Sequence, residues 1–218
     1  MKVLLVSTTF YPSPPKAYAG TELVVYNLAV ELNKLGHKVA VVAPKGSSFP
    51  EGIEHIPTVD PVLGQMQEDV AWPMFLPRLV NLQTQRGTGE FDIVHENSFR
   101  MWSYMAAKDH KEVKVCATVH WQMHWPMVGA GGPPVPKPSL ICLSQSHAMA
   151  TSTALGLHCE YVYNGIDTEA YPLQKTKGDR FLFLGRIARF KAPHEAIGLA
   201  EAHRFPLDVA GEDRFVND

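Results

Sequence analysis

Two apolar runs, VLLVST at residues 3–8 and KVAVVA at residues 38–43, enclose a helical pattern that starts near Thr21 and ends at Gly36. Such runs, rich in β-branched residues, are typical of strands buried on both faces of a parallel sheet. The apolar stripe expected to face that sheet consists of Val24, Leu28, Leu32 and Leu35. Gly36 suits the residue after a helix, where the left-handed conformation is common. Together the three elements predict a right-handed βαβ unit.

The alternation of strands and helices continues along the chain. Further strands are expected at residues 53–56, 91–95, 113–119, 140–143 and 160–163. Further helices are expected at residues 75–85, 101–109 and 145–155. Repeated alternation of this kind predicts an α/β fold with an open, doubly wound parallel sheet, as in Rossmann-like domains.

A polar stretch without hydrophobic periodicity separates this part from a second strand–helix–strand series. We place a first domain at residues 1–167, a linker at 168–179 and a second domain at 180–218. The second series holds one βαβ unit, and about forty residues are marginal as an independent domain. We therefore expect an incomplete second Rossmann-like domain, whose unpaired sheet edge predicts self-association or a partner chain that completes it.

Composition and charge are those of an ordinary globular protein. Hydrophobic residues make up 45% and charged residues 19% of the 218 residues, and the formal net charge is −2. Proteins that bind nucleic acid generally carry a basic surplus, so no nucleic-acid partner is expected. The irregular spacing of Cys116, Cys142 and Cys159 does not describe a disulfide framework, and the apolar strand-like runs that contain Cys116 and Cys142 predict buried reduced thiols. The first apolar run is too short for a signal peptide or a membrane span, so we predict a cytoplasmic protein.

The first of two candidate anion-binding turns joins the first strand to its helix. Neither a Gly-x-Gly-x-x-Gly fingerprint after that strand nor a P-loop motif occurs in the sequence. The turn ends instead in Gly20 and Thr21, where helix N–H groups and the helix dipole favour an anion. The same pair of residues is also typical of a plain helix cap, so the turn alone leaves both interpretations open.

The second candidate turn follows the strand expected at residues 180–184 and contains Gly185, Arg186 and Lys191. Ligands of open α/β sheets bind beyond the carboxyl ends of the strands, where these two cations are expected. Arginine binds a phosphate through two parallel hydrogen bonds, and lysine supplies a compact charge. Taken alone, the turn is equally consistent with two solvated surface cations.

Several motifs occur in the order seen in family-4 retaining glycosyltransferases, which have the two-Rossmann-domain (GT-B) fold, and this resemblance covers essentially the whole chain. The earlier motifs are AGTE at residues 19–22, LGHKV at 35–39, FDIVH at 91–95 and TVH at 118–120. The later motifs are LSQS at residues 143–146, YNGID at 163–167 and LGRI at 184–187, followed by Lys191. The chain departs from the family in having Ala192 where glycine is usual, and it lacks the Glu-rich donor-binding loop.

The resemblance implies a role for each candidate residue. The donor-binding residues that it implies are Gly20, Thr21, Gly185, Arg186 and Lys191, and the catalytic residues are His120, Arg186 and Lys191. His120 is expected to contact the donor sugar. Arg186 and Lys191 are expected to hold the diphosphate and to stabilise the charge that develops as the nucleotide leaves. Gly20 and Thr21 are expected to face the donor diphosphate or the acceptor.

The implied function is transfer of a sugar from a UDP-, GDP- or ADP-sugar to a carbohydrate, lipid or small-molecule acceptor, with retention and without a metal or other cofactor. His120 and His124 have the spacing of a metal pair on a helix, but a Gly- and Pro-rich loop is expected here. Glu96 and Asn97, just beyond a strand, are further candidates for acceptor contact. The alternatives are a non-catalytic binding or assembly subunit and a different GT-B enzyme, such as a nucleotide-sugar epimerase.

Overall fold

The computed structural model describes residues 1–58, 91–98, 114–120 and 139–212. These residues belong to two compact units, Met1–Ile166 and Asp167–Asp218. The helices predicted at residues 75–85 and 101–109 lie outside the described residues.

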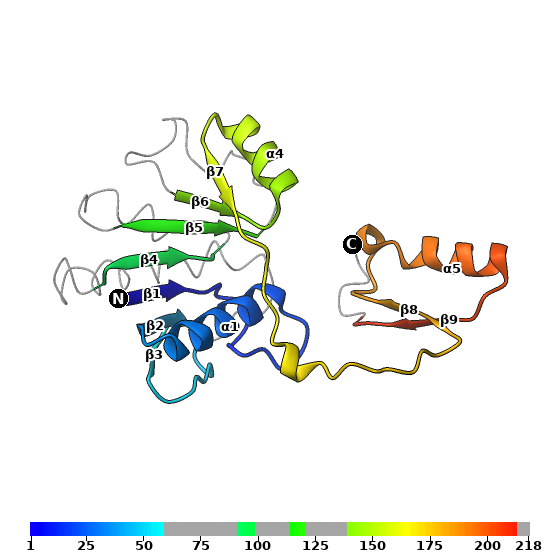
Figure 1. The fold of residues 1–218 in the computed structure, drawn as a ribbon, viewed down its shortest axis with the longest axis horizontal. Helices are drawn as coiled ribbons and strands as arrows, with labels where there is room; N and C mark the ends of the chain where they lie inside the picture. Colours follow the sequence, from blue (N-terminus) through cyan, green and yellow to red (C-terminus); the bar gives the residue numbers. More distant parts are fainter. Residues whose placement is uncertain (59–90, 99–113, 121–138, 213–218) are drawn as a thin grey trace. The chain divides into compact units, whose positions relative to one another are not determined.

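The first unit is built on a seven-stranded sheet with the strand order β3-β2-β1-β4-β5-β6-β7 (Figure 1). The strands are β1 (Lys2–Val6), β2 (Lys38–Ala43), β3 (Ile53–Pro57), β4 (Ile93–Glu96), β5 (Val115–Val119), β6 (Ser139–Cys142) and β7 (Cys159–Tyr161). All neighbouring strands pair in parallel. Buried β1 and β2 are apolar almost throughout, as strands covered on both faces must be. The predicted α/β fold with an open parallel sheet is therefore confirmed.

The strand order of the sheet reverses at β1. Strands β2 and β3 lie on one side of β1, whereas β4, β5, β6 and β7 lie on the other. Val6 at the end of β1 is in register with Val42 on one side and with Glu96 on the other. The carboxyl ends of β1 and β4 therefore meet at the point where the strand order reverses. Open α/β sheets bind their ligands at such a switch point.

Helix α1 (Gly20–Lys34) packs against β1, β2 and β3 through a face that differs from the predicted stripe. Its buried residues are Glu22, Val25 and Ala29, whereas Leu35 is 73% exposed. Val25 and Ala29 are one turn apart, and their small side chains allow the helix to approach the buried residues of the sheet. Leu28 and Leu32 lie at the margin of this contact, where they are partly buried. The helix is followed by Gly36 at φ 81°, which confirms the predicted left-handed position.

Helix α4 (Gln145–Leu155) packs against β6 and β7 and has clear signals at both ends. The Ser144 side chain accepts a hydrogen bond from the backbone N–H of His147, and Gly156 follows the helix at φ 62°.

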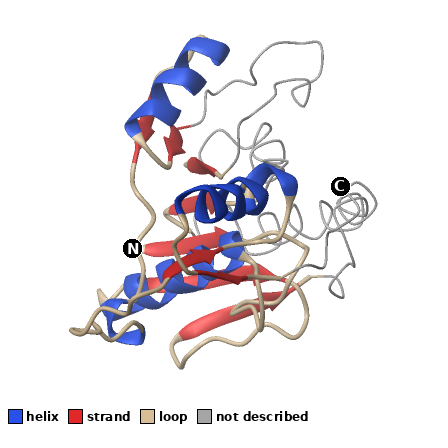
Figure 2. Cartoon of the chain, turned by 90° about the vertical axis from the view of Figure 1, so that its right-hand side faces the viewer, coloured by secondary structure: helices blue, strands red, loops and turns tan. Residues whose placement is uncertain are grey.

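All three cysteines are buried and free. Figure 2 shows the helices in blue and the strands in red. None of the described helices has both the length and the apolar character that crossing a bilayer requires.

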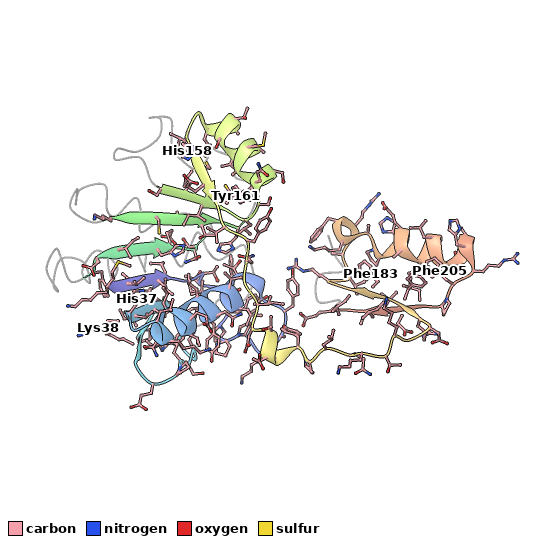
Figure 3. The ribbon with its side chains drawn as sticks, in the orientation of Figure 1. His37, Lys38, His158, Tyr161, Phe183 and Phe205 are labelled. Atoms are coloured by element: carbon pink, nitrogen blue, oxygen red, sulfur yellow. The ribbon has the colours of Figure 1, made fainter. Side chains whose placement is uncertain are left out.

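The second unit is one βαβ unit, as predicted, and consists of β8 (Phe181–Leu184), α5 (Pro193–His203) and β9 (Leu207–Ala210), with short 3₁₀ turns at Thr168–Ala170 and Arg189–Lys191. Strands β8 and β9 are parallel. Phe183 and Phe205 lie on the side of the strands that faces α5 (Figure 3). The alternate residues Leu182 and Leu184 are 61% and 76% exposed. Asp208 is in register with Leu182 and pairs with Arg180, so among the described residues this exposed face carries both apolar and charged side chains.

Candidate functional site

Two buried polar segments meet at the switch point of the first unit. Ser7, Thr8 and Thr9 follow β1, and each is at most 2% exposed. Residues 96–98 end and follow β4, and none is more than 4% exposed. The two segments are joined where the backbone N–H of Asn97 donates to the carbonyl of Val6 at 2.9 Å. Polar side chains are thus concentrated at the edge of the sheet where a ligand is expected.

Helix α1 begins at the same edge. Ala19 precedes the helix without capping it through a side chain, and the first intrahelical hydrogen bond runs from Leu23 N–H to Ala19. The N–H groups before Leu23 therefore have no partner within the helix. A side chain built at Gly20 would meet no atom within 4 Å. The predicted pair Gly20 and Thr21 thus lies at a helix N-terminus with open space beside it, and its role in binding stays a prediction.

Glu22 is a buried residue of this region to which sequence reasoning assigned no role. Glu22 is 3% exposed, and the Thr8 hydroxyl donates a hydrogen bond to its carboxylate. Burial raises the pKa of Glu22, while hydrogen bonds from Thr8 and from the backbone of Tyr11 oppose that rise. Burial favours the uncharged form of Glu22, and this form would repel an anion at this helix end less than the carboxylate would. A glutamate in the first turn is usually read as a capping residue, so its burial had no sequence signal.

Two histidines link the ends of β4 and β5. His95 Nε2 lies 2.7 Å from Thr118 Oγ1, and His120 Nε2 lies 3.1 Å from Asn97 Oδ1. His95 and Thr118 lie within β4 and β5, and Asn97 and His120 directly follow these strands, so both links join the two strands near their carboxyl ends. The structure therefore places His120, a predicted site residue, within two strands of the switch point and in direct contact with Asn97.

Both of these histidines are held uncharged by their surroundings. Burial lowers the pKa of His95 to about 4. Burial lowers the pKa of His120 to about 4 as well, with smaller contributions from His95 and His147. A neutral imidazole presents one donor and one acceptor. His120 is thus equipped to exchange hydrogen bonds with hydroxyl groups rather than to pair with an anion.

His147 is a further polar residue near His120 that sequence reasoning missed. Its Nδ1 accepts a hydrogen bond from the backbone N–H of Leu143 at 3.3 Å. Its Nε2 is buried and has no hydrogen-bond partner in the described part of the chain. A histidine three residues after an N-cap serine resembles any surface residue of a first helical turn. Only the tertiary structure places it close enough to His120 to influence its pKa.

In the second unit, Arg186 and Lys191 are brought to the same aromatic ring. The Arg186 guanidinium carbon lies 5.7 Å from the centre of the Phe190 ring, and Lys191 Nζ lies 5.7 Å from the same centre. Arg186 is half-buried, whereas Lys191 is exposed. Both follow the carboxyl end of β8 and precede α5. The two predicted cations therefore lie in the segment between β8 and α5, and their role in binding stays a prediction.

The glycines of this turn differ in their structural roles. A side chain built at Gly185 would meet Phe183 at an ordinary distance of 3.7 Å, so space there does not require glycine. A side chain at Gly211 would lie 1.7 Å from the carbonyl oxygen of Gly185, so Gly211 must be glycine for β9 to leave the sheet here. Ala192, in place of the family's usual glycine, has a left-handed φ of 56°. This conformation explains why glycine is favourable there.

The catalytic residues predicted from sequence thus fall into two groups. His120 belongs to the first unit, and Arg186 and Lys191 belong to the second. Within residues 1–58, 91–98, 114–120 and 139–212, no group of three or more His, Cys, Asp or Glu residues is arranged to hold a metal ion. His124, the second member of the spaced histidine pair, lies outside these ranges.

Solved structures of glycosyltransferases share this fold. AviGT4, a glycosyltransferase involved in avilamycin A biosynthesis, has a TM-score of 0.63 and 24% identity over 98% of this chain. HepE from Anabaena in complex with UDP and glucose has a TM-score of 0.68 and 17% identity over 99%. The catalytic domain of starch synthase IV from Arabidopsis thaliana, bound to ADP and acarbose, has a TM-score of 0.63 and 15% identity over 96%.

This chain spans 57%, 62% and 68% of the lengths of these three structures, respectively. Comparison with curated protein sequences gave no significant match. The family model for Glycosyltransferase Family 4 matches residues 18–170, which include helix α1, the histidine links and the start of the segment that follows β7. The chain therefore belongs to Glycosyltransferase Family 4.

Proposed function

We propose that the chain acts in the transfer of a sugar from a nucleotide-diphosphate donor to a carbohydrate, lipid or small-molecule acceptor, with retention at the anomeric carbon. The observation that supports this most directly is the turn after β8, where Arg186 and Lys191 lie about the same Phe190 ring. Two cations in one turn at a strand's carboxyl end suit a diphosphate, which carries adjacent negative charges.

The proposed roles follow from the chemistry of each group. Arg186 and Lys191 bind the diphosphate and stabilise the charge that develops on it as the bond to the sugar breaks. His120, which is neutral, hydrogen-bonds the donor sugar. Gly20 and Thr21 present backbone N–H groups toward the donor diphosphate or the acceptor. No step in this scheme requires a metal or another cofactor, and the donor is a UDP-, GDP- or ADP-sugar.

Two further features bear on where and how the chain works. Because it spans 57% and 62% of the first two structural neighbours, we propose the activity for a complete enzyme to which this chain contributes the residues above. We also propose a cytoplasmic location. The buried, free state of its three cysteines supports this, since thiols stay reduced in that compartment.

Calorimetric and thermal-shift titrations with UDP, GDP and ADP test the diphosphate site. One of the three is expected to bind the wild type, and Arg186→Ala should weaken it by about tenfold or more, because a charge-assisted hydrogen bond is lost. Arg189→Ala is the matched control, since Arg189 is an exposed arginine of the same turn. Binding that is absent, or that Arg189→Ala weakens equally, would contradict the proposed site.

A non-catalytic assembly subunit is the second candidate, and the exposed face of β8 favours it. Leu182 and Leu184 are apolar and mostly exposed, which a second copy of this chain or a partner chain would cover. Sedimentation of the wild type and of Leu184→Glu separates the two functions. Self-association that Leu184→Glu abolishes, together with no diphosphate binding, would favour assembly over catalysis.

A further inference from the structure

Asn97 has both ends of its side-chain amide engaged. Its Nδ2 donates to the carbonyl oxygen of His95 at 3.2 Å, and its Oδ1 faces Nε2 of His120 at 3.1 Å. A carbonyl oxygen only accepts hydrogen bonds, so the amide nitrogen must be the group that points at His95. The amide oxygen then faces His120, and it too can only accept a hydrogen bond. The proton between the two side chains must therefore be carried by His120 Nε2.

This arrangement determines the remaining polar atom of the His120 ring. In a neutral imidazole with its proton on Nε2, Nδ1 has a free lone pair and accepts hydrogen bonds. The low pKa of His120, about 4, keeps the ring neutral near pH 7. Of the neighbouring rings, His95 Nε2 meets Thr118 and His147 Nδ1 accepts from Leu143, while His147 Nε2 has no hydrogen-bond partner among the described residues. Within the described part of the chain, Asn97 is the residue that hydrogen-bonds the His120 ring.

Asn97 is itself held firmly in place. It is 1% exposed, and its backbone N–H donates to Val6 of β1 at 2.9 Å. The backbone of Asn97 is therefore fixed at the point where β4 ends beside β1, and this fixes the position from which its side chain extends. A side chain so buried and so bonded is suited to orient another residue. It is less suited to the direct acceptor contact that its sequence position suggested.

We propose that Asn97 is a positioning residue that keeps the proton of His120 on Nε2, so that Nδ1 accepts a hydrogen bond from a hydroxyl of the donor sugar. The part of this inference that concerns the sugar rests on the proposed function. The tautomer of His120 does not rest on it. The two parts can therefore be tested by separate measurements on the same variants.

Long-range ¹⁵N–¹H NMR of the full chain tests the tautomer, because it distinguishes a protonated from an unprotonated ring nitrogen. In the wild type, His120 should carry its proton on Nε2. In Asn97→Ala the signals of the two ring nitrogens should move toward each other, as both tautomers become populated. In Asn97→Asp the pKa of His120 should rise, because a carboxylate then faces its Nε2–H.

Thr118→Val is the matched control. It removes the other histidine link between β4 and β5, the one from His95, and leaves the Asn97–His120 contact in place. It should leave the His120 tautomer unchanged. A wild-type proton on Nδ1, or an unaltered tautomer in Asn97→Ala, would overturn the positioning role. If Asn97→Ala does not fold, an unchanged His120 pKa in Asn97→Asp would overturn it.

Binding of UDP-glucose, GDP-mannose and ADP-glucose, each compared with its free diphosphate, tests the sugar contact. Asn97→Ala should bind the preferred sugar nucleotide about tenfold more weakly and the free diphosphate as tightly as the wild type. Equal loss for both ligands, or no loss, would overturn the sugar contact. If the wild type binds none of these ligands, the proposed function fails and takes the sugar contact with it, while the NMR result still decides the tautomer.

Discussion

Single residues at the carboxyl edge of the sheet make the stability of this protein depend on pH. His95 and His120 have pKa values of about 4 in the folded chain, against 6.5 for an ordinary histidine. As the pH falls from 6.5 toward 4, the unfolded chain takes up protons that the folded chain does not. The folded state therefore loses stability in this window, and each histidine contributes up to about 1.4 kcal/mol per pH unit.

Replacing one of these histidines should flatten that dependence. In His95→Gln, the slope of the unfolding free energy between about pH 7 and pH 5 should fall by up to about 1.4 kcal/mol per pH unit, since one protonation step is removed. Urea unfolding at each pH measures the slope. His158→Gln, which removes a histidine side chain that is 81% exposed, is the control. Equal slopes in His95→Gln and the wild type would contradict the buried, neutral state of His95.

At the residue scale, sequence reasoning found groups by type and missed those defined by their neighbours. His120, Arg186 and Lys191 stand in recognisable motifs. The structure places His120 just beyond β5, Arg186 just beyond β8, and Lys191 at the end of the 3₁₀ turn that precedes α5. Glu22 and His147 had no such signal. Their importance comes from burial and from contacts with residues distant in the sequence, and neither quantity is visible in a linear pattern.

At the scale of elements, the predicted helices and strands were most accurate where local chemistry marks their ends. Helix α4 has the predicted bounds, with Ser144 as its N-cap and Gly156 after its last residue, and Pro193 opens helix α5. The face of α1 was predicted only in part: Leu28 and Leu32 pack against the core, but Val25 and Ala29 are the apolar residues buried at its centre and Leu35 is exposed. The sheet selects the side whose small residues, Val25 and Ala29, allow the closest approach.

Two glycines of the second unit should respond to alanine in opposite directions. Gly211→Ala should destabilise the β8–β9 pair by about 1–3 kcal/mol, because its side chain would collide with the backbone at Gly185. Gly198 is exposed within α5, where a side chain meets no atom within 4 Å. Gly198→Ala should stabilise the helix by about 1 kcal/mol.

Hydrogen exchange of the Gly185 amide measures both effects, since this group donates to the Ala210 carbonyl at 3.0 Å. Exchange should be faster in Gly211→Ala and no faster in Gly198→Ala than in the wild type. Protection of the Gly185 amide in Gly211→Ala at the wild-type level would show that the strands tolerate the extra side chain.

At the scale of the whole molecule, the two compact units are joined by a fully exposed stretch. Every residue from 160 to 182 is exposed, and this stretch contains Lys175 and Lys177. Exposed segments with few contacts are the preferred sites of proteolysis. Trypsin at low concentration is expected to cut first after these two lysines.

Mass spectrometry of the early fragments checks this expectation. Lys175→Gln combined with Lys177→Gln should slow the first cut without changing the fold of either unit. First cuts within residues 1–58 would instead mean that the larger unit opens more readily than the connecting stretch.

The sequence by itself determined the fold class, the order of most described elements and the types of residue available for chemistry. It could do so because strand runs, helix caps and breaking glycines are local properties, set by backbone sterics and nearby side chains. The motif order also identified the family before any geometry was known.

Only the tertiary structure decided which of these residues work together. Strand order brings β1 beside β4, although some ninety residues separate them in the chain, as the pairing of Leu5 with His95 shows. That pairing buries Asn97 and sets it against His120, and it surrounds His120 with groups that keep it neutral. Burial and electrostatic coupling depend on distances through space, and residues far apart along the chain acquire those distances only when the sheet has formed.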